Sequence, residues 1–470
     1  MRIATLTGLT VILFIFFSSF FSSCRKKDKI NNDPSMVLSF SSDTVYFDTV
    51  FTTVGSVTQR LRVYNMNNYK VSISSIRLAG GEQSNYRINI NGTPAISLNN
   101  VEIPGEDSLF IFVRVTVDPN SKNTPFIVSD SILFNTNGNA QQVKLVAWGQ
   151  NAFFHKNAHL SGELYWDSLK AHVIYGELMI DSASSLTLLP GTRIYFHQKS
   201  ALTFAGGSKI LAYGTMEHPV WFAGDRLDPY YRDLPGQWEG IFFKKGSTGN
   251  EISYGIIKNG KTGIGIFSGN VSGQADLQLD NTVIQNMTGD GIYSESSAIV
   301  STNCVIGNCG GSALGIAGGG SYDFRQLTVG NYWSGSVRTS PSLYLSNFVY
   351  DTLGNKIPCP LTKAFFGNSI LYGNSGEELM YDTVSSVAFE YQFDHCLLRT
   401  AKDLSDPVRY INCLADQDPK FINPQLFDYR IDSISPAIGT GIPMGVPFDI
   451  LGQERGETPD LGAFEYVKHR

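Results

Sequence analysis

The chain has 470 residues, 17% of them charged, and a formal net charge of −6. These charges are spread along the chain with no Lys/Arg-rich block after residue 36, so nucleic acid is not an expected partner. Gly (46), Phe (30) and Tyr (22) are abundant, which favours strands and tight turns. No long stretch has the 3.6-residue period of an amphipathic helix. The sequence therefore predicts an all-β protein with more than one domain.

The N-terminus has an apolar run over residues 3–21, followed by Ser22, Ser23 and Cys24. That run is short for a membrane span, and small residues directly precede the cysteine. The arrangement resembles a bacterial lipoprotein signal. The resemblance implies cleavage of residues 1–23, acylation of Cys24 and attachment to the outer membrane or the cell surface. An ordinary secretory signal or a single membrane anchor is the alternative.

Residues 24–36 are polar and aperiodic, so we expect a solvated tether there. Residues 37–150 alternate apolar and polar positions between turn residues, which predicts a β-sandwich. In FDTVF at 47–51 and DSILF at 130–134, this segment resembles the immunoglobulin-like domains of exported Bacteroidota proteins. The resemblance implies a spacer or an interaction module.

After an expected linker or N-terminal cap at 151–172, the chain becomes repetitive. Similar apolar strands end at Asn286, Asn308 and Asn331, which are 22 and 23 residues apart. A short strand, an Asn turn and a second strand at this period are typical of a parallel β-solenoid. Asn tolerates left-handed backbone, and stacked amides can form a ladder. Residues 173–430 resemble the right-handed parallel β-helix superfamily, and the handedness comes from that resemblance.

Five cysteines follow Cys24, namely Cys304, Cys309, Cys359, Cys396 and Cys413. An odd number leaves at least one without an intrachain partner. Cys304 and Cys396 fall in one inward-facing column about four coils apart, which is about 19 Å along the stack. A disulfide needs Cα atoms within about 7 Å. We therefore expect buried free thiols.

The C-terminal motifs DPKF, SPAIG, DILGQER and DLGAFEY, between residues 418 and 466, resemble the ending of exported β-helix proteins. An open solenoid end exposes unpaired strand edges, so a cap is required there. We assign that cap to residues 431–470. Its Arg and acidic residues are expected to hydrogen-bond the cap to the last coil.

One insertion, Gly224–Gly240, interrupts the coil pattern and must loop out. Its aromatic and basic side chains are candidates for stacking on sugar rings and for bonding their hydroxyl or carboxylate groups. These candidate glycan contacts are Tyr230, Tyr231, Trp238, Arg226 and Arg232. The alternative is that the aromatic side chains pack on the solenoid flank and the charges pair among themselves.

No metal site or cofactor is predicted. His155 and His159 have a spacing that suits a metal on a helix, but they lie in a β-linker without a third ligand. Asp276, Asp280 and Asp290 are near one another in sequence but do not share a repeat column, which makes calcium binding a weak hypothesis.

The sequence also lacks the polygalacturonase-like residues, because it has no Asp-Asp pair and no Gly-His-Gly. No catalytic residue is assigned. We predict a lipid-anchored envelope protein with a binding or structural role toward glycans. A polysaccharide lyase or a glycoside hydrolase acting on an extended glycan is the alternative.

Overall fold

The computed structural model describes residues 27–119, 126–228, 230–267 and 275–468. The predicted signal and Cys24 lie outside these residues. The chain divides into two compact units, Met1–Asn151 and Ala152–Arg470. The described residues form strands and two short 3-10 helices, η1 (Gly81–Gln83) and η2 (Pro424–Leu426). Within them, no helix is long and apolar enough to cross a membrane.

The first unit consists of two β-sheets. One contains β1 (Lys27–Ile30), β3 (Thr44–Phe51), β5 (Tyr69–Leu78), β8 (Ser97–Ile103), β10 (Phe126–Thr136) and β11 (Asn139–Gln150). The other contains β2 (Ser39–Phe40), β4 (Gln59–Asn65), β6 (Tyr86–Ile90), β7 (Thr93–Ala95) and β9 (Asp107–Val115). The first has the order β1-β5-β10-β11-β3, with β8 paired to β5, and the second has the order β2-β4-β9-β6-β7.

Side-chain alternation places the core of this unit between its sheets. In β4, Leu61 and Val63 are fully buried while Arg60 and Arg62 are exposed. This period of two is what a strand with one buried face requires. The apolar members of both sheets form one cluster, so each sheet covers the inner face of the other.

The predicted tether at 24–36 is partly ordered, which differs from the expectation. Residues 27–30 form β1, which pairs in parallel with β5. Asn137 Nδ2 donates to the carbonyl oxygen of Asn31 at 3.1 Å. The polar sequence gave no periodic signal, yet its backbone groups find partners at the sheet edge.

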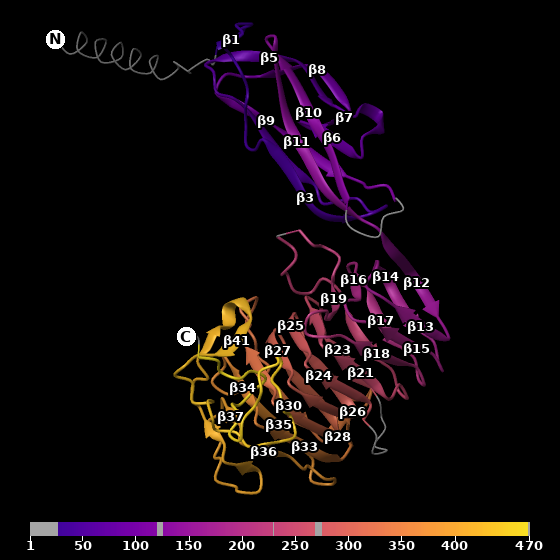
Figure 1. Ribbon diagram of the computed structural model, residues 1–470, viewed down its shortest axis with the longest axis vertical. Helices are drawn as coiled ribbons and strands as arrows, with labels where there is room; N and C mark the ends of the chain where they lie inside the picture. Colours follow the sequence, from indigo (N-terminus) through magenta and orange to yellow (C-terminus); the bar gives the residue numbers. More distant parts are fainter. Residues whose placement is uncertain (1–26, 120–125, 229, 268–274, 469–470) are drawn as a thin grey trace, which may run out of the picture. The chain divides into compact units, whose positions relative to one another are not determined.

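The second unit is a parallel solenoid whose 26-stranded sheet winds from β12 (Ala152–Leu160) to β39 (Leu414–Ala415) (Figure 1). Each complete coil contributes a strand to each of three faces, called here the first, second and third sheets in chain order. The first sheet contains the first half of β14 (Ala171–Ile180), β16 (Arg193–Phe196), β19 (Val220–Gly224), β22 (Gly255–Lys258), β25 (Val283–Met287), β27 (Val305–Cys309), β29 (Thr328–Asn331), β34 (Ile370–Gly373), β37 (Leu397–Leu398) and β39.

The second sheet contains the second half of β14, β17 (Ala201–Phe204), β20 (Gly240–Phe243), β23 (Ile264–Phe267), the first halves of β26 (Ile292–Thr302) and β28 (Leu314–Arg325), β30 (Leu343–Ser346) and β35 (Leu379–Asp382). The third sheet contains β13 (Glu163–Trp166), β15 (Ser185–Leu188), β18 (Lys209–Tyr213), β21 (Asn250–Ser253), β24 (Leu277–Asp280), the second halves of β26 and β28, β33 (Leu361–Gly367), β36 (Gln392–Asp394) and β38 (Tyr410–Ile411). Two hairpins, β31 (Phe348–Tyr350) with β32 (Lys356–Pro358) and β40 (Phe421–Asn423) with β41 (Asp428–Ile431), lie outside the coils.

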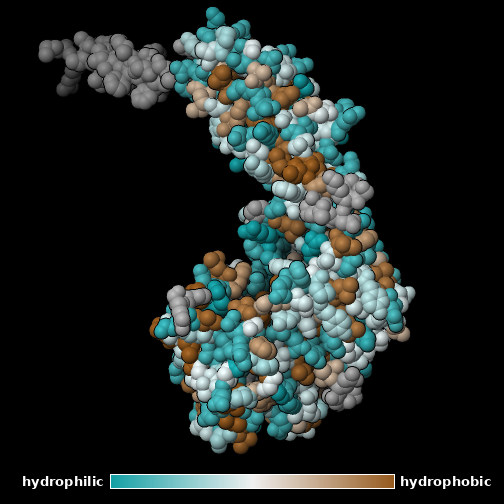
Figure 2. Space-filling view, in the orientation of Figure 1, coloured by the Kyte–Doolittle hydropathy of each residue, from teal (hydrophilic) through white to brown (hydrophobic). Residues whose placement is uncertain are grey.

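Identical positions on successive coils stack inside the solenoid. On the third sheet, Phe324, Phe366, Phe393 and Tyr410 form a continuous pile with centroid separations of 5.3, 4.9 and 5.6 Å. The rings of each pair lie within 12° of parallel. Such stacking extends the core from coil to coil, because no coil closes a core alone. On the face seen in Figure 2, small groups of hydrophilic and hydrophobic side chains alternate.

The predicted asparagine ladder is present. Asn286 Nδ2 donates to Asn259 Oδ1 at 2.7 Å, and Asn308 Nδ2 donates to Asn286 Oδ1 at 2.8 Å. All three residues have left-handed backbone, with φ between 52° and 67°. The ladder ends at Asn308, because Asn331 is not left-handed and its Oδ1 accepts from the backbone N–H of Cys309 at 2.7 Å.

A second corner column of left-handed residues was not predicted. It precedes the third-to-first-sheet turn of each coil and comprises Tyr254, Asn281, Asn303, Gln326, Asn368, His395 and Asn412. The residue that directly follows each member of this column in the sequence is buried or partly buried. This explains the placement of Cys304, Cys396 and Cys413, which are free thiols directed into the coils.

The solenoid has different bounds from those expected. The segment 151–172, expected to be a linker or an N-terminal cap, belongs to the solenoid, because β12 and β13 form its first coil and pair with β14 and β15 of the second. The last coil strand, β39, ends at Ala415 rather than near residue 430. Terminal coils lack the full repeat, so their sequences gave no periodic signal.

The C-terminal segment lies along the side of the first sheet, so the expectation that residues 431–470 cover the open end is wrong. Asn368 Nδ2 donates to the carbonyl oxygen of Ile442 at 2.6 Å, and the N–H of Ala463 donates to Thr328 Oγ1 at 2.8 Å. Figure 1 shows this yellow segment crossing β27 and β34.

The outward side chains of the first sheet explain this placement. Val305, Ile370 and Leu397 point away from the coil interior and would be exposed on a bare solenoid. Leu461 of the C-terminal segment packs in the same cluster as Ile370 and Leu397. Removing this apolar area from water stabilises the lateral position of the segment.

Candidate functional site

The predicted loop between β19 and β20 is fixed to the asparagine ladder. Asn259 Nδ2 donates to the carbonyl oxygen of Arg232 at 2.6 Å, and Asn286 Nδ2 donates to that of Asp233 at 2.7 Å. Lys258 Nζ also lies 3.1 Å from Asp233 Oδ1. The ladder therefore holds both the coil corners and the second half of the loop.

Trp238 is a core residue, so its assignment as a glycan contact is wrong. Its side chain is fully buried and stacks on Phe196 at a centroid separation of 4.0 Å. Its indole N–H donates to the carbonyl oxygen of Lys258 at 2.9 Å. The ring gains apolar contact while its single polar group is satisfied, which favours burial over exposure.

The other four predicted contacts lie on the loop surface. Tyr230 is 73% exposed, and its ring meets Tyr231 edge-on at 4.8 Å. The guanidinium of Arg226 lies 3.4 Å from the centre of the Tyr231 ring, and its Nε is 3.5 Å from Asp228 Oδ2. Arg232 pairs with its neighbour Asp233. The charges thus pair within the loop, as the packing alternative anticipated, and Tyr230 keeps a free face.

A histidine that the sequence analysis did not select lies beside this loop. His197 Nδ1 is 2.8 Å from Asp225 Oδ2, and the His197 ring stacks on Tyr175 at 4.4 Å. The hydrogen bond to Asp225 raises the pKa of His197. Residues 197 and 225 are 28 apart, and only the stacking of coils brings them together.

A regular aromatic column occupies the outer surface of the second sheet. The register aligns Phe242, Gly265, Tyr293, Gly315 and Tyr344 on five successive coils. The three aromatic side chains point outward and are partly exposed, whereas their strand neighbours point into the core. We call these five residues the aromatic stripe.

Gly265 makes room for the Phe242 ring on the preceding coil, whereas Gly315 meets the Tyr293 ring only in ordinary van der Waals contact. A Cβ atom on Gly265 would lie 2.7 Å from Phe242 Cδ1, so the Phe242 ring leans over that glycine. A Cβ on Gly315 would lie 3.5 Å from Tyr293 Cδ2. The Phe242 ring therefore lies along the sheet surface over Gly265 rather than projecting from it.

Carboxylates border the stripe. Asp290 Oδ2 lies 3.5 Å from the place that a Cβ on Gly315 would take, and Asp290 Oδ1 accepts from the N–H of Ser312 at 2.7 Å. Burial raises the pKa of Asp290. Burial, Glu295 and Asp290 together raise the pKa of Tyr293.

At the far end of the stripe, burial and, to a smaller extent, Asp382 raise the pKa of Tyr344. Lys356 Nζ of the β31–β32 hairpin is 3.2 Å from Asp382 Oδ1. Flat rings flanked by carboxylate acceptors provide the two groups that sugars need, apolar faces for their C–H groups and acceptors for their hydroxyls.

The stripe was not predicted from the sequence because its members are of different residue types. Alternate coils carry glycine where the others carry an aromatic residue, so the 22-residue alignment shows no repeated aromatic position. A two-coil period at outward-facing positions would have been the signal. It becomes visible once the register is known.

The metal hypotheses are not supported. His155 Nε2 is 3.0 Å from His172 Nδ1, and His159 Nδ1 is 2.9 Å from Asp181. In the portion of the chain that the structure describes, no three His, Cys, Asp or Glu side chains gather as a metal site. Asp276 and Asp280 are engaged by the Ala298 N–H and by Thr302 Oγ1.

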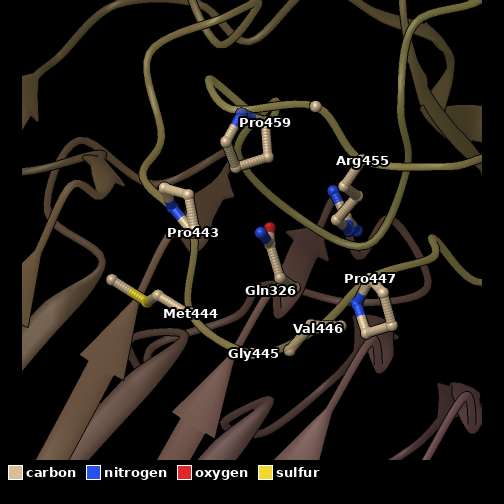
Figure 3. A pocket seen from close by; sticks show the side chains of 9 residues that line it. Gln326, Pro443, Met444, Gly445, Val446, Pro447, Arg455 and Pro459 are labelled. Carbon is tan, nitrogen blue, oxygen red and sulfur yellow. The ribbon is translucent and has the colours of Figure 1, made fainter.

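A cavity of about 350 Å³ lies between the C-terminal segment and the coil corner at Gln326 (Figure 3). Its walls include Pro443, Met444, Pro447 and Pro459. Its one charged lining residue, Arg455, donates to Asn303 Oδ1 and pairs with Glu465. That arginine holds the segment to the solenoid, as expected of the basic and acidic residues there, although the coil it contacts is not the last.

The profile of the right-handed β-helix region matches residues 190–331. The solenoid is a right-handed parallel β-helix. The coils extend beyond the matched residues in both directions, from β12 to β39. No curated protein sequence matches the chain.

Two solved structures align with parts of this chain at low identity. A family 123 glycoside hydrolase from Clostridium perfringens is 10% identical, covers 28% of this chain and 30% of its own, and gives a TM-score of 0.19. The catalytic unit of a GH87 α-1,3-glucanase from Streptomyces thermodiastaticus is 10% identical. The alignment covers 76% of this chain and 65% of the glucanase chain, with a TM-score of 0.25. The chain thus spans less than a third of the first enzyme and about two thirds of the second. Their activities are not transferred to it.

Proposed function

We propose that this chain binds a glycan through the second sheet of its solenoid and is held at the cell envelope by a lipid on Cys24. The observation that carries the proposal is the aromatic stripe. Three partly exposed rings, Phe242, Tyr293 and Tyr344, lie along one face with carboxylates beside them. Aromatic faces gain from contact with apolar surface, while the carboxylates accept hydrogen bonds.

The loop between β19 and β20 also supports glycan binding, but through fewer residues than the sequence predicted. Tyr230 offers an exposed ring, whereas Trp238 is buried and Arg226 and Arg232 are paired with carboxylates. We therefore assign the principal contacts to the stripe, and assign Tyr230 a further contact at a separate place.

Glycan binding is tested by calorimetry with the chain from residue 25 onward, which keeps β1, against a panel of soluble oligosaccharides. Tyr293→Ala should weaken binding by about 1–2 kcal/mol, the scale of aromatic contacts at interfaces. The matched control is Tyr165→Ala, because Tyr165 is 66% exposed on β13, outside the stripe. Equal affinities for wild type and both variants would remove the stripe from the site.

Envelope attachment is tested separately. Replacing Cys24 with Ser should leave the chain unprocessed or without lipid, because the lipoprotein signal places the acyl group on that thiol. Fractionation of cells that express the two forms provides the readout. Normal processing and membrane retention of the Ser variant would contradict the lipid anchor.

One observation favours the alternative of a glycan-cleaving enzyme. The raised pKa of Asp290 is a property of carboxyl groups that donate a proton in catalysis. Release of shortened or unsaturated sugars by the wild-type chain, abolished by Asp290→Asn, would establish catalysis. Binding without any such product is the result expected here.

A further inference from the structure

We infer that the ligand of the aromatic stripe is an extended, uncharged β-1,4-linked glycan that lies parallel to the solenoid axis. This inference rests on the proposed function and specifies its substrate class. It follows from two properties of the stripe, namely the spacing of its rings and the sign of the charges beside it.

The rings recur on every second coil. Phe242 and Tyr293 are separated by the coil of Gly265, and Tyr293 and Tyr344 by the coil of Gly315. Neighbouring strands are about 4.8 Å apart, so successive rings are about 9.6 Å apart along the axis. An extended β-1,4-linked chain advances by a similar length for each pair of sugars. Every second sugar therefore presents the same face to the next ring.

Curved glycans do not fit this arrangement. An α-1,4-linked chain coils, so it cannot keep its sugars in line with three rings that follow a straight axis. The Phe242 ring also lies over the next coil, because a Cβ atom on Gly265 would be only 2.7 Å from Phe242 Cδ1. Such a surface receives the broad face of a ribbon-like chain.

The charges beside the stripe disfavour an acidic glycan. Asp290 and Glu295 flank Tyr293, and both raise its pKa by their negative charge. Lys356, at the far end, is already paired with Asp382. A polyuronate would bring its carboxylates against these groups, whereas the hydroxyls of a neutral glycan can donate to them.

The first experiment compares ligands on the wild-type chain by calorimetry. Cellohexaose, mannohexaose and chitohexaose represent extended neutral β-1,4 chains, maltohexaose represents a curved chain, and oligogalacturonate represents an acidic one. We expect at least one of the first three to bind at least about tenfold more tightly than both others. The same glycan shortened to a disaccharide should lose about tenfold or more, because it reaches one ring at a time.

The second experiment moves one ring by one coil without changing the number of rings. Tyr293→Ala combined with Gly315→Tyr places the middle ring on the next coil. Gly315 tolerates a side chain, because its backbone is not left-handed and a Cβ there meets only ordinary contacts at 3.5 Å. Hexasaccharide affinity should fall to that of Tyr293→Ala alone, with an unchanged unfolding midpoint as the check on folding.

The outcomes separate the inference from the proposed function. Wild-type affinity in the relocated variant, or preference for maltohexaose or oligogalacturonate, would overturn the inference while glycan binding stands. Absence of binding to every glycan in the panel would overturn both. Preferential binding of the extended neutral chains, lost on relocation of the ring, supports both.

Discussion

Asn286 Nδ2 donates to Asn259 Oδ1 on the preceding coil at 2.7 Å, and the same nitrogen donates to the carbonyl oxygen of Asp233 at 2.7 Å. One buried amide thus joins two coils and the loop between β19 and β20. Asn286 also adopts a left-handed backbone with φ of 62°. Its side chain and its backbone therefore contribute to stability by separate mechanisms.

Replacing this residue should lower the free energy of unfolding in two distinguishable steps. Asn286→Gly keeps the left-handed turn but removes the amide, and we expect a loss of about 1–3 kcal/mol from the partners left unbonded. Asn286→Ala adds backbone strain of about 1 kcal/mol or more. Urea denaturation of both variants measures the two contributions. Unchanged midpoints for both would contradict a structural ladder.

The repeated turns of the solenoid could be predicted from the sequence, because the same local chemical requirement recurs in each coil. Asn259, Asn286 and Asn308 satisfy the same left-handed turn at the same interval, so periodicity revealed both the turn and the ladder. The C-terminal segment could not be placed in this way. Its position depends on the outward apolar side chains of the first sheet, and which residues face outward is known only from the register.

The candidate site was harder to predict for a related reason. Trp238 and Tyr230 occur in one loop with similar neighbours, yet one is fully buried and the other is exposed. The difference comes from Phe196, which lies on an earlier coil and offers a flat partner only to Trp238. Contacts between coils decide which loop aromatic is available, and no local pattern encodes them.

Trp238→Ala should therefore destabilise the solenoid. Loss of a buried Trp removes its apolar contacts and leaves a cavity, so we expect the free energy of unfolding to fall by about 3–5 kcal/mol. Tyr230→Ala, in the same loop, should change the free energy of unfolding by less than about 0.5 kcal/mol because that ring is exposed. Thermal unfolding of the two variants provides the comparison. Similar midpoints for both would place Trp238 outside the core.

Acid should weaken the packing between the first two coils through His172, which lies on β14 and contacts His155 on β12. Burial, with a smaller effect of the adjacent His155, lowers the pKa of His172 to about 3. Above about pH 6.5 both folded and unfolded states hold the neutral ring. As pH falls below that value the unfolded state binds a proton that the folded state refuses, so stability decreases by up to about 1.4 kcal/mol per pH unit until about pH 3.

His172→Phe should flatten this decline, because phenylalanine keeps the stacking on Trp166 without a titrating group. His159→Phe is the control, since His159 is exposed and lies on β12, the strand that pairs with the β14 strand of His172. Free energies of unfolding measured at a series of pH values for the three proteins supply the slopes. A His172→Phe slope equal to that of wild type would assign the acid sensitivity to other groups.

Arg455 should control the docking of the C-terminal segment on the first sheet. Its buried guanidinium pairs with Glu465 and donates to Asn303 Oδ1 at 2.9 Å and to the carbonyl oxygen of Gly462 at 3.0 Å. Arg455→Met leaves a partly buried carboxylate without its cation, which costs about 3–5 kcal/mol. We expect limited proteolysis to cleave the segment after residue 431 while the coils stay intact.

Two further variants separate the buried pair from surface charge. Arg455→Met combined with Glu465→Gln removes both charges. This double variant should recover much of the resistance of the C-terminal segment to proteolysis, because replacing a whole buried pair is far less costly than breaking it. Arg430→Met removes an exposed pair with Asp428 and should alter cleavage little. If Arg455→Met is cleaved no faster than Arg430→Met, the segment is held by the apolar contacts of Leu461 and its neighbours, with no contribution from the arginine.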